Sequence, residues 1–208
     1  MGIRIERVRS SIVVVTPPAA PDDLVVTVDA LKKNCGFAST DTDFDDAFRR
    51  LILEATDYVE NAARCYLRPF VIDEQFEYFP YGTNPIRLSR EPVRSITSVS
   101  YKDEAGVTQT MDPADYQTWL SHNPPLVSPT GGECWPDTDQ NALQAMTVRY
   151  AAGPVSVSAD YRPTLDNAVM LIATATWNNA DGKERHGPLV TPPRALDLIQ
   201  AGAIKGYE

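Results

Sequence analysis

The sequence predicts an α+β fold in which a helical bundle with one long helix carries an inserted, small antiparallel β-sheet unit. Apolar residues recur every three to four positions from Phe44 to Tyr66, as they do on one face of a long amphipathic helix. From Val71 to Tyr150, segments rich in β-branched and aromatic residues alternate with turn residues. A helical pattern returns from Pro163 to Trp177. The β-rich stretch therefore lies between two helical segments, as expected for a sheet inserted into a helical core.

Residues 28–69 and 160–180 are expected to form this helical core. A short helix begins at Val28 and stops at Gly36, and a longer helix follows with Thr42 as its N-cap. Pro69 is expected to end the longer helix, because the residue before a proline is disfavoured in the helical region. At about 1.5 Å per residue, this helix would be about 35 Å long and the longest element of the chain.

Residues 70–153 are expected to form the inserted β-unit. Its strand-like segments are Ile72–Phe79, Ile86–Leu88, Ile96–Tyr101, Tyr116–Leu120 and Met146–Tyr150. Lys102–Gly106 follows one of these segments and has the composition of a hairpin turn. Asn123–Asp139 contains four prolines and a pair of glycines, so we expect a long irregular loop there.

Residues 1–27 are expected to form an extended N-terminal arm. Prolines at positions 17, 18 and 21 prevent a regular element after its β-branched run. Such a run is typical of an edge strand, which another subunit can complete. We therefore interpret the arm as a contact between subunits, and a disordered tail is the alternative. The contacting residues would be Ile12, Val13, Val14 and Val15.

Composition narrows the classes of function. The 208 residues carry a net charge of −9, which argues against wrapping a nucleic-acid backbone, because phosphate affinity comes from concentrated Lys and Arg. An acidic wall past which DNA slides is still compatible with this charge. No stretch approaches the roughly 20 apolar residues of a membrane helix. The early apolar run Ile12–Val15 is too short for the core of a signal peptide, so we expect a protein made in the cytoplasm.

No metal or cofactor site is expected. The acidic run Asp41–Asp46 resembles the start of a calcium loop, but Asp46 and Ile52 stand where an EF-hand needs glycine and glutamate. A helix start explains the acidic residues better, because the helix dipole favours negative charge there. The three cysteines are far apart and lack a histidine cluster, so we expect buried thiols at Cys35, Cys65 and Cys134.

No catalytic site is expected either. His122 and His186 lie in loop-like polar sequence, and Ser121 beside His122 has no evident third group to orient the base. The glycine pair at 131–132 lacks the strand and helix that flank a phosphate-binding loop. With little positive charge nearby, packing in a core or an interface is favoured over base stacking for Trp119, Trp135 and Trp177.

Several local strings occur in a defined order and spacing between about residue 14 and residue 180. They are Val14–Ala19, Ala30–Lys32, Asp43–Ala47, Ala55–Glu60, Ile86–Ile96, Val99–Asp103, Val148–Gly153 and the helix from Pro163 to Trp177. In order, spacing and coverage, the strings together resemble the head–tail connector (adaptor, or head-completion) family of long-tailed double-stranded DNA phages and gene transfer agents. No single string is diagnostic of that family.

The resemblance implies a structural protein of the virion's head–tail interface, made in the bacterial host cytoplasm. A ring of such subunits, twelve to match the portal, would dock under the portal and extend the DNA channel. It would present a surface to stopper or tail-completion proteins, with DNA only as passing cargo, no cofactor and no membrane. Two alternatives stay open: another ring protein of this interface, such as a stopper or tail terminator, and an accessory nuclease or peptidase.

Residues 188–208 are expected to form a C-terminal docking helix. Two prolines at 192–193 open it, and Gly187-Pro188 separates it from the preceding helix. A helix of about twelve residues is marginal alone in water, so its apolar face needs a cover. Folding back onto its own subunit is one solution. The resemblance implies docking onto the portal instead, through Arg194, Leu196, Leu198, Ile199 and Ile204.

Overall fold

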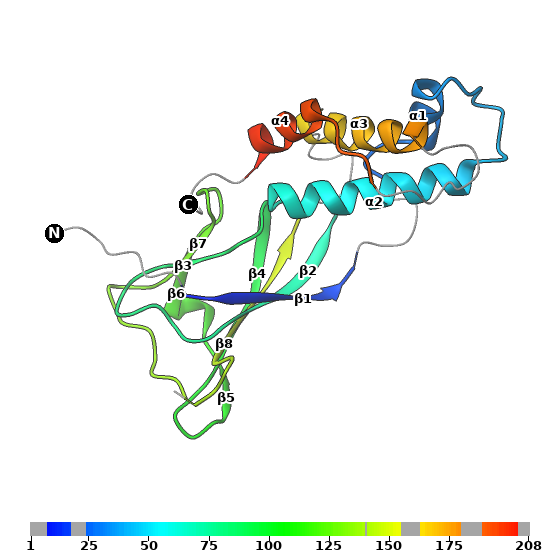
Figure 1. Ribbon diagram of the computed structural model, residues 1–208. Helices are drawn as coiled ribbons and strands as arrows, with labels where there is room; N and C mark the ends of the chain where they lie inside the picture. The colour runs from blue at the N-terminus through cyan, green and yellow to red at the C-terminus, as the bar shows by residue number, and fades with distance from the viewer. Residues whose placement is uncertain (1–7, 18–23, 140, 155–162, 180–188, 204–208) are drawn as a thin grey trace. The chain divides into compact units, whose positions relative to one another are not determined.

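The computed structural model describes residues 8–17, 24–139, 141–154, 163–179 and 189–203, and it divides into two compact units (Figure 1). The sheet unit comprises the first strand and residues 69–153, and the helical unit comprises the described residues of 24–68 and 154–203. Helices and antiparallel sheets are thus segregated into separate units, and the predicted α+β class is confirmed.

Four helices form the described part of the helical unit: α1 (Val28–Asn34), α2 (Asp45–Ala63), α3 (Pro163–Asn179) and α4 (Pro193–Gly202). α2 has 19 residues and α3 has 17, so two helices of similar length stand where the sequence predicts one dominant helix. α1 begins where Thr27 Oγ1 accepts the backbone N–H of Ala30 at 3.2 Å. It ends at Asn34, and the predicted stop residue, Gly36, follows two positions later with a φ of +81°.

α2 begins later than the sequence predicts and without a side-chain cap. Its first residue is Asp45, and the preceding Phe44 makes no capping side-chain hydrogen bond. Thr42 contributes only its backbone carbonyl, which accepts the N–H of Asp45 at 3.2 Å. Asp45, at the acidic start of α2, forms an ion pair with Lys32 of α1. The side chain of Lys32 is 2% exposed. The acidic run is therefore a helix start, although Thr42 is not its cap.

α2 also ends earlier than predicted, at Ala63, and Pro69 is not the cause. Arg64 adopts a left-handed conformation with φ of 56° and ends the helix there. The chain then turns back, because the buried Oε1 of Glu60 accepts the backbone N–H groups of Leu67 at 2.9 Å and Arg68 at 3.1 Å. A buried carboxylate in the last helical turns, rather than a proline, sets this boundary.

The core of the helical unit lies between the apolar faces of α2 and α3. The buried side chains are Phe48, Leu51, Ile52, Ala55 and Val59 of α2, and Leu165, Ala168, Val169, Ile172 and Ala173 of α3. The ring of Trp177 lies 4.2 Å from that of Phe48, and Phe37 meets both rings edge-on. These are the faces that the 3.6-residue period predicts.

The sheet unit holds two antiparallel sheets where the sequence predicts one small sheet. Five strands pair in the order β1-β2-β8-β4-β5, and three pair in the order β3-β7-β6. Their bounds are β1 (Ser10–Thr16), β2 (Phe70–Phe76), β3 (Ile86–Arg87), β4 (Val93–Lys102), β5 (Thr108–Thr110), β6 (Tyr116–Trp119), β7 (Leu126–Pro129) and β8 (Met146–Ala152).

Two strands of this unit were not predictable from the apolar pattern. β5 consists of exposed polar residues, and only its pairing with β4 across the predicted hairpin identifies it. β7 lies inside the stretch 123–139 that the sequence predicts as an irregular loop, yet it pairs with both β3 and β6. β7 was not predicted because of the prolines at 124, 125 and 129, since proline usually argues against a central strand.

Candidate assembly surfaces

β1 is an edge strand with apolar side chains on both faces. It pairs antiparallel with β2 of its own chain, from Ser10 opposite Phe76 to Thr16 opposite Val71, and its other edge has no partner strand in the part of the chain that the structure describes (Figure 1). The predicted contact residues lie within it. Ile12 is half-buried, whereas Val13, Val14 and Val15 are 46%, 47% and 41% exposed. A long apolar edge of this kind favours pairing with, or packing against, another chain.

A buried carboxylate holds β1 to the sheet. Glu74 of β2 is fully buried, and its Oε1 accepts the hydroxyl of Ser10 at 2.8 Å. Its Oε2 accepts the hydroxyl of Tyr150 at 2.7 Å and the backbone N–H of Ser89 at 3.0 Å. Three donors therefore compensate the desolvation of this carboxylate. The sequence analysis did not identify Glu74 as buried, because its donors come from parts of the chain that are distant in sequence.

α4 folds back onto the helical unit, which is the alternative that the sequence left open. Ala195 and Ile199 are buried in the core, at 0% and 4% exposure. Ile199 is thus not available on a docking face, because it fills its own subunit's core. Leu198 is half-buried against the same core, and Ile204 lies outside the described residues. Only Arg194, which is exposed, and Leu196, which is 42% exposed, remain as outward docking candidates.

Gly202 has a packing role at the end of α4. A Cβ added at this position would lie 2.6 Å from Cδ2 and 2.8 Å from Cγ of Leu165, which is itself buried in α3. The absence of a side chain therefore lets α4 approach α3 closely. The sequence analysis expected a break at Gly187-Pro188 to separate α4 from the other helices. This expectation is wrong, because the contact of Gly202 with Leu165 and the burial of Ile199 join α4 to the helical core.

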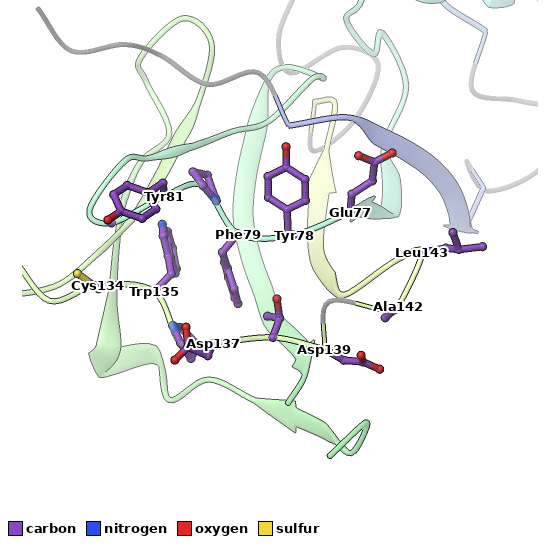
Figure 2. A pocket seen from close by; sticks show the side chains of 14 residues that line it. Glu77, Tyr78, Phe79, Tyr81, Cys134, Trp135, Asp137, Asp139, Ala142 and Leu143 are labelled. Atoms are coloured by element: carbon purple, nitrogen blue, oxygen red, sulfur yellow. The ribbon is translucent and has the colours of Figure 1, made fainter. Parts of the chain in front are cut away.

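The sheet unit contains a pocket of about 640 Å³ with aromatic walls (Figure 2). The rings of Phe79 and Trp135 stack with centroids 4.8 Å apart and planes 9° from parallel. Trp135 is fixed further, because its Nε1 donates to the carbonyl of Asn84 at 2.8 Å. Tyr78 and Tyr81 line the same pocket and are 41% and 84% exposed. The sequence analysis did not identify this site, since its two halves are more than fifty residues apart along the chain.

Negative charge is concentrated in one part of the sheet unit. The stretch 103–148 contains seven acidic residues and no Lys or Arg. The carboxylates of Glu77, Asp137 and Asp139 line the pocket, and none of the described lining residues is basic. By contrast, residues 1–9 carry Arg4, Arg7 and Arg9 against one glutamate. The net charge of −9 is therefore unevenly distributed.

The described residues show no group of three or more His, Cys, Asp or Glu side chains arranged to hold a metal ion. His122 follows β6, with its Nδ1 2.7 Å from the carbonyl oxygen of Pro124 and its ring 4.6 Å from that of Trp119. These contacts explain His122 as a structural residue of the turn. His186 lies outside the described residues.

The expectation that all three thiols are buried needs correction. Cys65 is buried, but Cys35 is half-buried and Cys134 is exposed, so burial does not hold for all three cysteines. For the tryptophans, core packing is confirmed at Trp135 and Trp177, which pack against other rings, and packing in an interface stays a prediction for Trp119, which is 59% exposed. Within the described ranges, no helix combines the length and the hydropathy that crossing a membrane requires.

Comparison with solved structures identifies the fold. A chain of the virion of a native gene transfer agent particle matches with a TM-score of 0.72 and 18% identity, over 95% of this chain and 97% of that one. A chain from the neck of an empty gene transfer agent particle, computed with C6 symmetry, matches over the same shares with a TM-score of 0.68 and 19% identity. A chain from the neck of a native particle, computed with C12 symmetry, matches likewise with a TM-score of 0.66. No family model and no curated protein sequence matches the chain. At this identity the likeness establishes a shared fold, and it extends over almost the whole of both chains.

Proposed function

We propose that this chain is a subunit of a ring in the neck of a phage-like particle, where it acts as the head–tail adaptor beneath the portal. The observation that carries the proposal is the near-complete match of fold to chains from the virion and neck of gene transfer agent particles. The sequence strings resemble the adaptor family independently of that match. In this role the protein contacts other copies of itself, the portal, and a stopper or tail-completion protein, and it has no catalytic task.

A ring requires each subunit to contact its neighbours, and β1 supplies a suitable element. Its outer edge has no partner strand among the described residues, and its three valines expose apolar surface that a neighbouring subunit could cover. The neck of the native gene transfer agent particle was computed with C12 symmetry. By analogy, we propose a ring of twelve copies for this chain.

The proposed portal contact uses the outer face of α4, centred on Arg194 and Leu196. The inner face is occupied by the subunit's own core, so docking leaves the fold of α4 unchanged. DNA is passing cargo in this proposal, and the acidic stretch 103–148 supports it, because like charge keeps phosphate from adhering to a channel wall.

The test is assembly on purified portal rings, imaged by negative-stain electron microscopy and quantified by co-purification. The wild-type chain should add a ring to one end of the portal, and Leu196→Asp should reduce co-purification at least tenfold without changing the melting temperature. Tyr58→Asp is the matched control, because Tyr58 is a similarly exposed apolar residue on α2, at 37%. Binding to a tail-tube end but not to the portal would instead identify a tail terminator.

A further inference from the structure

The pocket of the sheet unit borders the point at which the N-terminal segment joins the sheet. The carbonyl of Arg9 accepts the backbone N–H of Glu77 at 3.4 Å, and Ser10 is paired with Phe76. The regular ladder ends here, because β2 ends at Phe76 and residues 77 and 78 form a bend. Glu77 itself lines the pocket, so Arg9 holds the N-terminal segment to the sheet beside the pocket's wall.

A continued strand ladder is not available along the pocket, so side chains must provide the contacts with the segment before Arg9. Pro80 adds to this restriction, because it lines the pocket and has no N–H to donate. Seven residues span at most about 25 Å when extended, which is enough to cross a pocket of this size. The remaining requirement is chemical complementarity.

The pocket and the segment are complementary in charge and in apolar character. The pocket combines the carboxylates of Glu77, Asp137 and Asp139 with four aromatic rings, those of Tyr78, Phe79, Tyr81 and Trp135. The segment is Ile3, Arg4, Ile5, Glu6 and Arg7, followed by Val8 and Arg9, so apolar and basic residues predominate over its one glutamate. Guanidinium groups stack on aromatic faces and pair with carboxylates, and the intervening aliphatic side chains suit apolar walls.

We propose that this pocket is a binding site for an extended, arginine-bearing apolar segment, and that its occupant is residues 3–7 of the same chain. The tether at Arg9 gives the segment an effective concentration in the millimolar range, so weak individual contacts are sufficient. The site also anchors the residue at which β1 enters the sheet. This proposal does not depend on the neck role, since it concerns one subunit alone.

Cys134 provides a direct test, because it is exposed and lines the pocket. The full-length Ile5→Cys variant should form a disulfide between positions 5 and 134 on mild oxidation. The product should run as a monomer on a non-reducing gel, with the linkage identified by peptide mapping. Cys134→Ser in the same background should abolish it, and Ser11→Cys, which is held opposite Gln75, should not form the bridge. A dimer linked through positions 5 and 134 would overturn the same-chain assignment in favour of a second copy, and the absence of any such bridge would overturn the site.

A second measurement separates specific binding from proximity. Deleting residues 1–7 should raise the rate at which Ellman's reagent modifies Cys134 at least threefold, with the rate of the Cys134→Ser variant subtracted as background. A synthetic peptide of residues 2–9 should restore protection, and the same peptide with glutamate for each arginine should not. Tyr81→Ala and Asp137→Asn should weaken the peptide's effect without unfolding the protein, because Tyr81 is 84% exposed. Equal protection by both peptides, or none by either, contradicts the proposal.

Discussion

The two terminal elements of the chain, α4 and β1, are both short and apolar, yet only one of them completes the subunit. α4 repeats its apolar residues on one face, so a single contact with the helical core buries Ala195 and Ile199 together. β1 has consecutive valines, and consecutive side chains on a strand point to opposite faces. Its own sheet cannot cover both faces, and all three valines remain exposed. The spacing of apolar residues thus separates an element of the fold from an element suited to assembly.

The largest expected effect on stability is that of Ile199→Ala in α4. The side chain is 4% exposed, and removing it leaves a cavity in the helical core. We expect a loss of about 2–5 kcal/mol in the free energy of unfolding, measured by urea denaturation followed at 222 nm. Leu196→Ala is the matched control on the same helix, with an expected change within about 0.5 kcal/mol. Similar losses of stability for both variants would mean that α4 does not pack against the helical core through the face that carries Ile199.

Gly202→Ala should have the next largest effect, through overpacking rather than a cavity. The new Cβ would overlap the side chain of Leu165, which is confined by the core. We expect a destabilisation of about 1–3 kcal/mol. The double variant with Leu165→Ala should be less unstable than the two single changes predict together, because the smaller side chain removes the clash. Strict additivity of the two changes would contradict this contact.

Asp166, in the first turn of α3, should make the helical unit less stable as pH rises. Burial raises the pKa of its carboxyl to about 6, above the value of about 3.9 in an unfolded chain. Because the folded pKa is the higher one, the stabilisation is fully present below about pH 4 and is lost as pH rises through 6. Asp166→Asn should therefore raise stability at pH 7.5 by about 1 kcal/mol, after allowing for the partial exposure of the group.

The measurement for Asp166 is a pair of urea titrations at pH 5 and pH 7.5, followed at 222 nm. The gain from Asp166→Asn should be smaller at pH 5, where more of the carboxyl is already protonated. Asp29→Asn is the control, because Asp29 is an exposed acid in the first turn of α1. It should lack this gain at pH 7.5, since its side chain is exposed and burial does not disfavour its charged form. An identical gain for Asp166→Asn at both pH values would contradict the raised pKa.

Periodicity in the sequence was sufficient to predict which face of a helix is buried and which strand lies at a sheet edge. The spacing from Phe48 to Val59 identified the buried face of α2, and the β-branched run from Ile12 to Val15 identified an edge strand. Features that depend on contacts distant in sequence were not predictable. The end of α2 depends on Glu60 meeting the backbone of Leu67 and Arg68 after the chain has turned.

Buried polar groups that pair with each other were the second kind of feature that could not be predicted from the sequence. Lys32 is buried because Asp45 of another helix meets it, and Glu74 is buried because Ser10, Ser89 and Tyr150 supply donors. Each residue alone would be expected at the surface. The aromatic pocket was missed for the same reason, since Phe79 and Trp135 become neighbours only in the folded chain.

The smallest expected effect on the fold, and the sharpest test of the comparison between α4 and β1, is the triple change Val13→Thr, Val14→Thr and Val15→Thr. Threonine is β-branched and close to valine in size, so the strand and its pairing with β2 should persist. Because all three side chains are already exposed, the melting temperature should change by only a few degrees.

Assembly should respond differently, because hydroxyl groups would be buried where a neighbouring subunit covers the strand. We expect at least a tenfold fall in the number of subunits retained on portal rings, measured by native mass spectrometry. The control is Tyr58→Thr, which removes exposed apolar surface of the helical unit and should assemble normally. If the triple variant assembles normally as well, β1 is an exposed edge without an assembly role, and the neighbouring subunits must meet through another surface. If it loses stability instead, β1 belongs to the fold in the same way as α4.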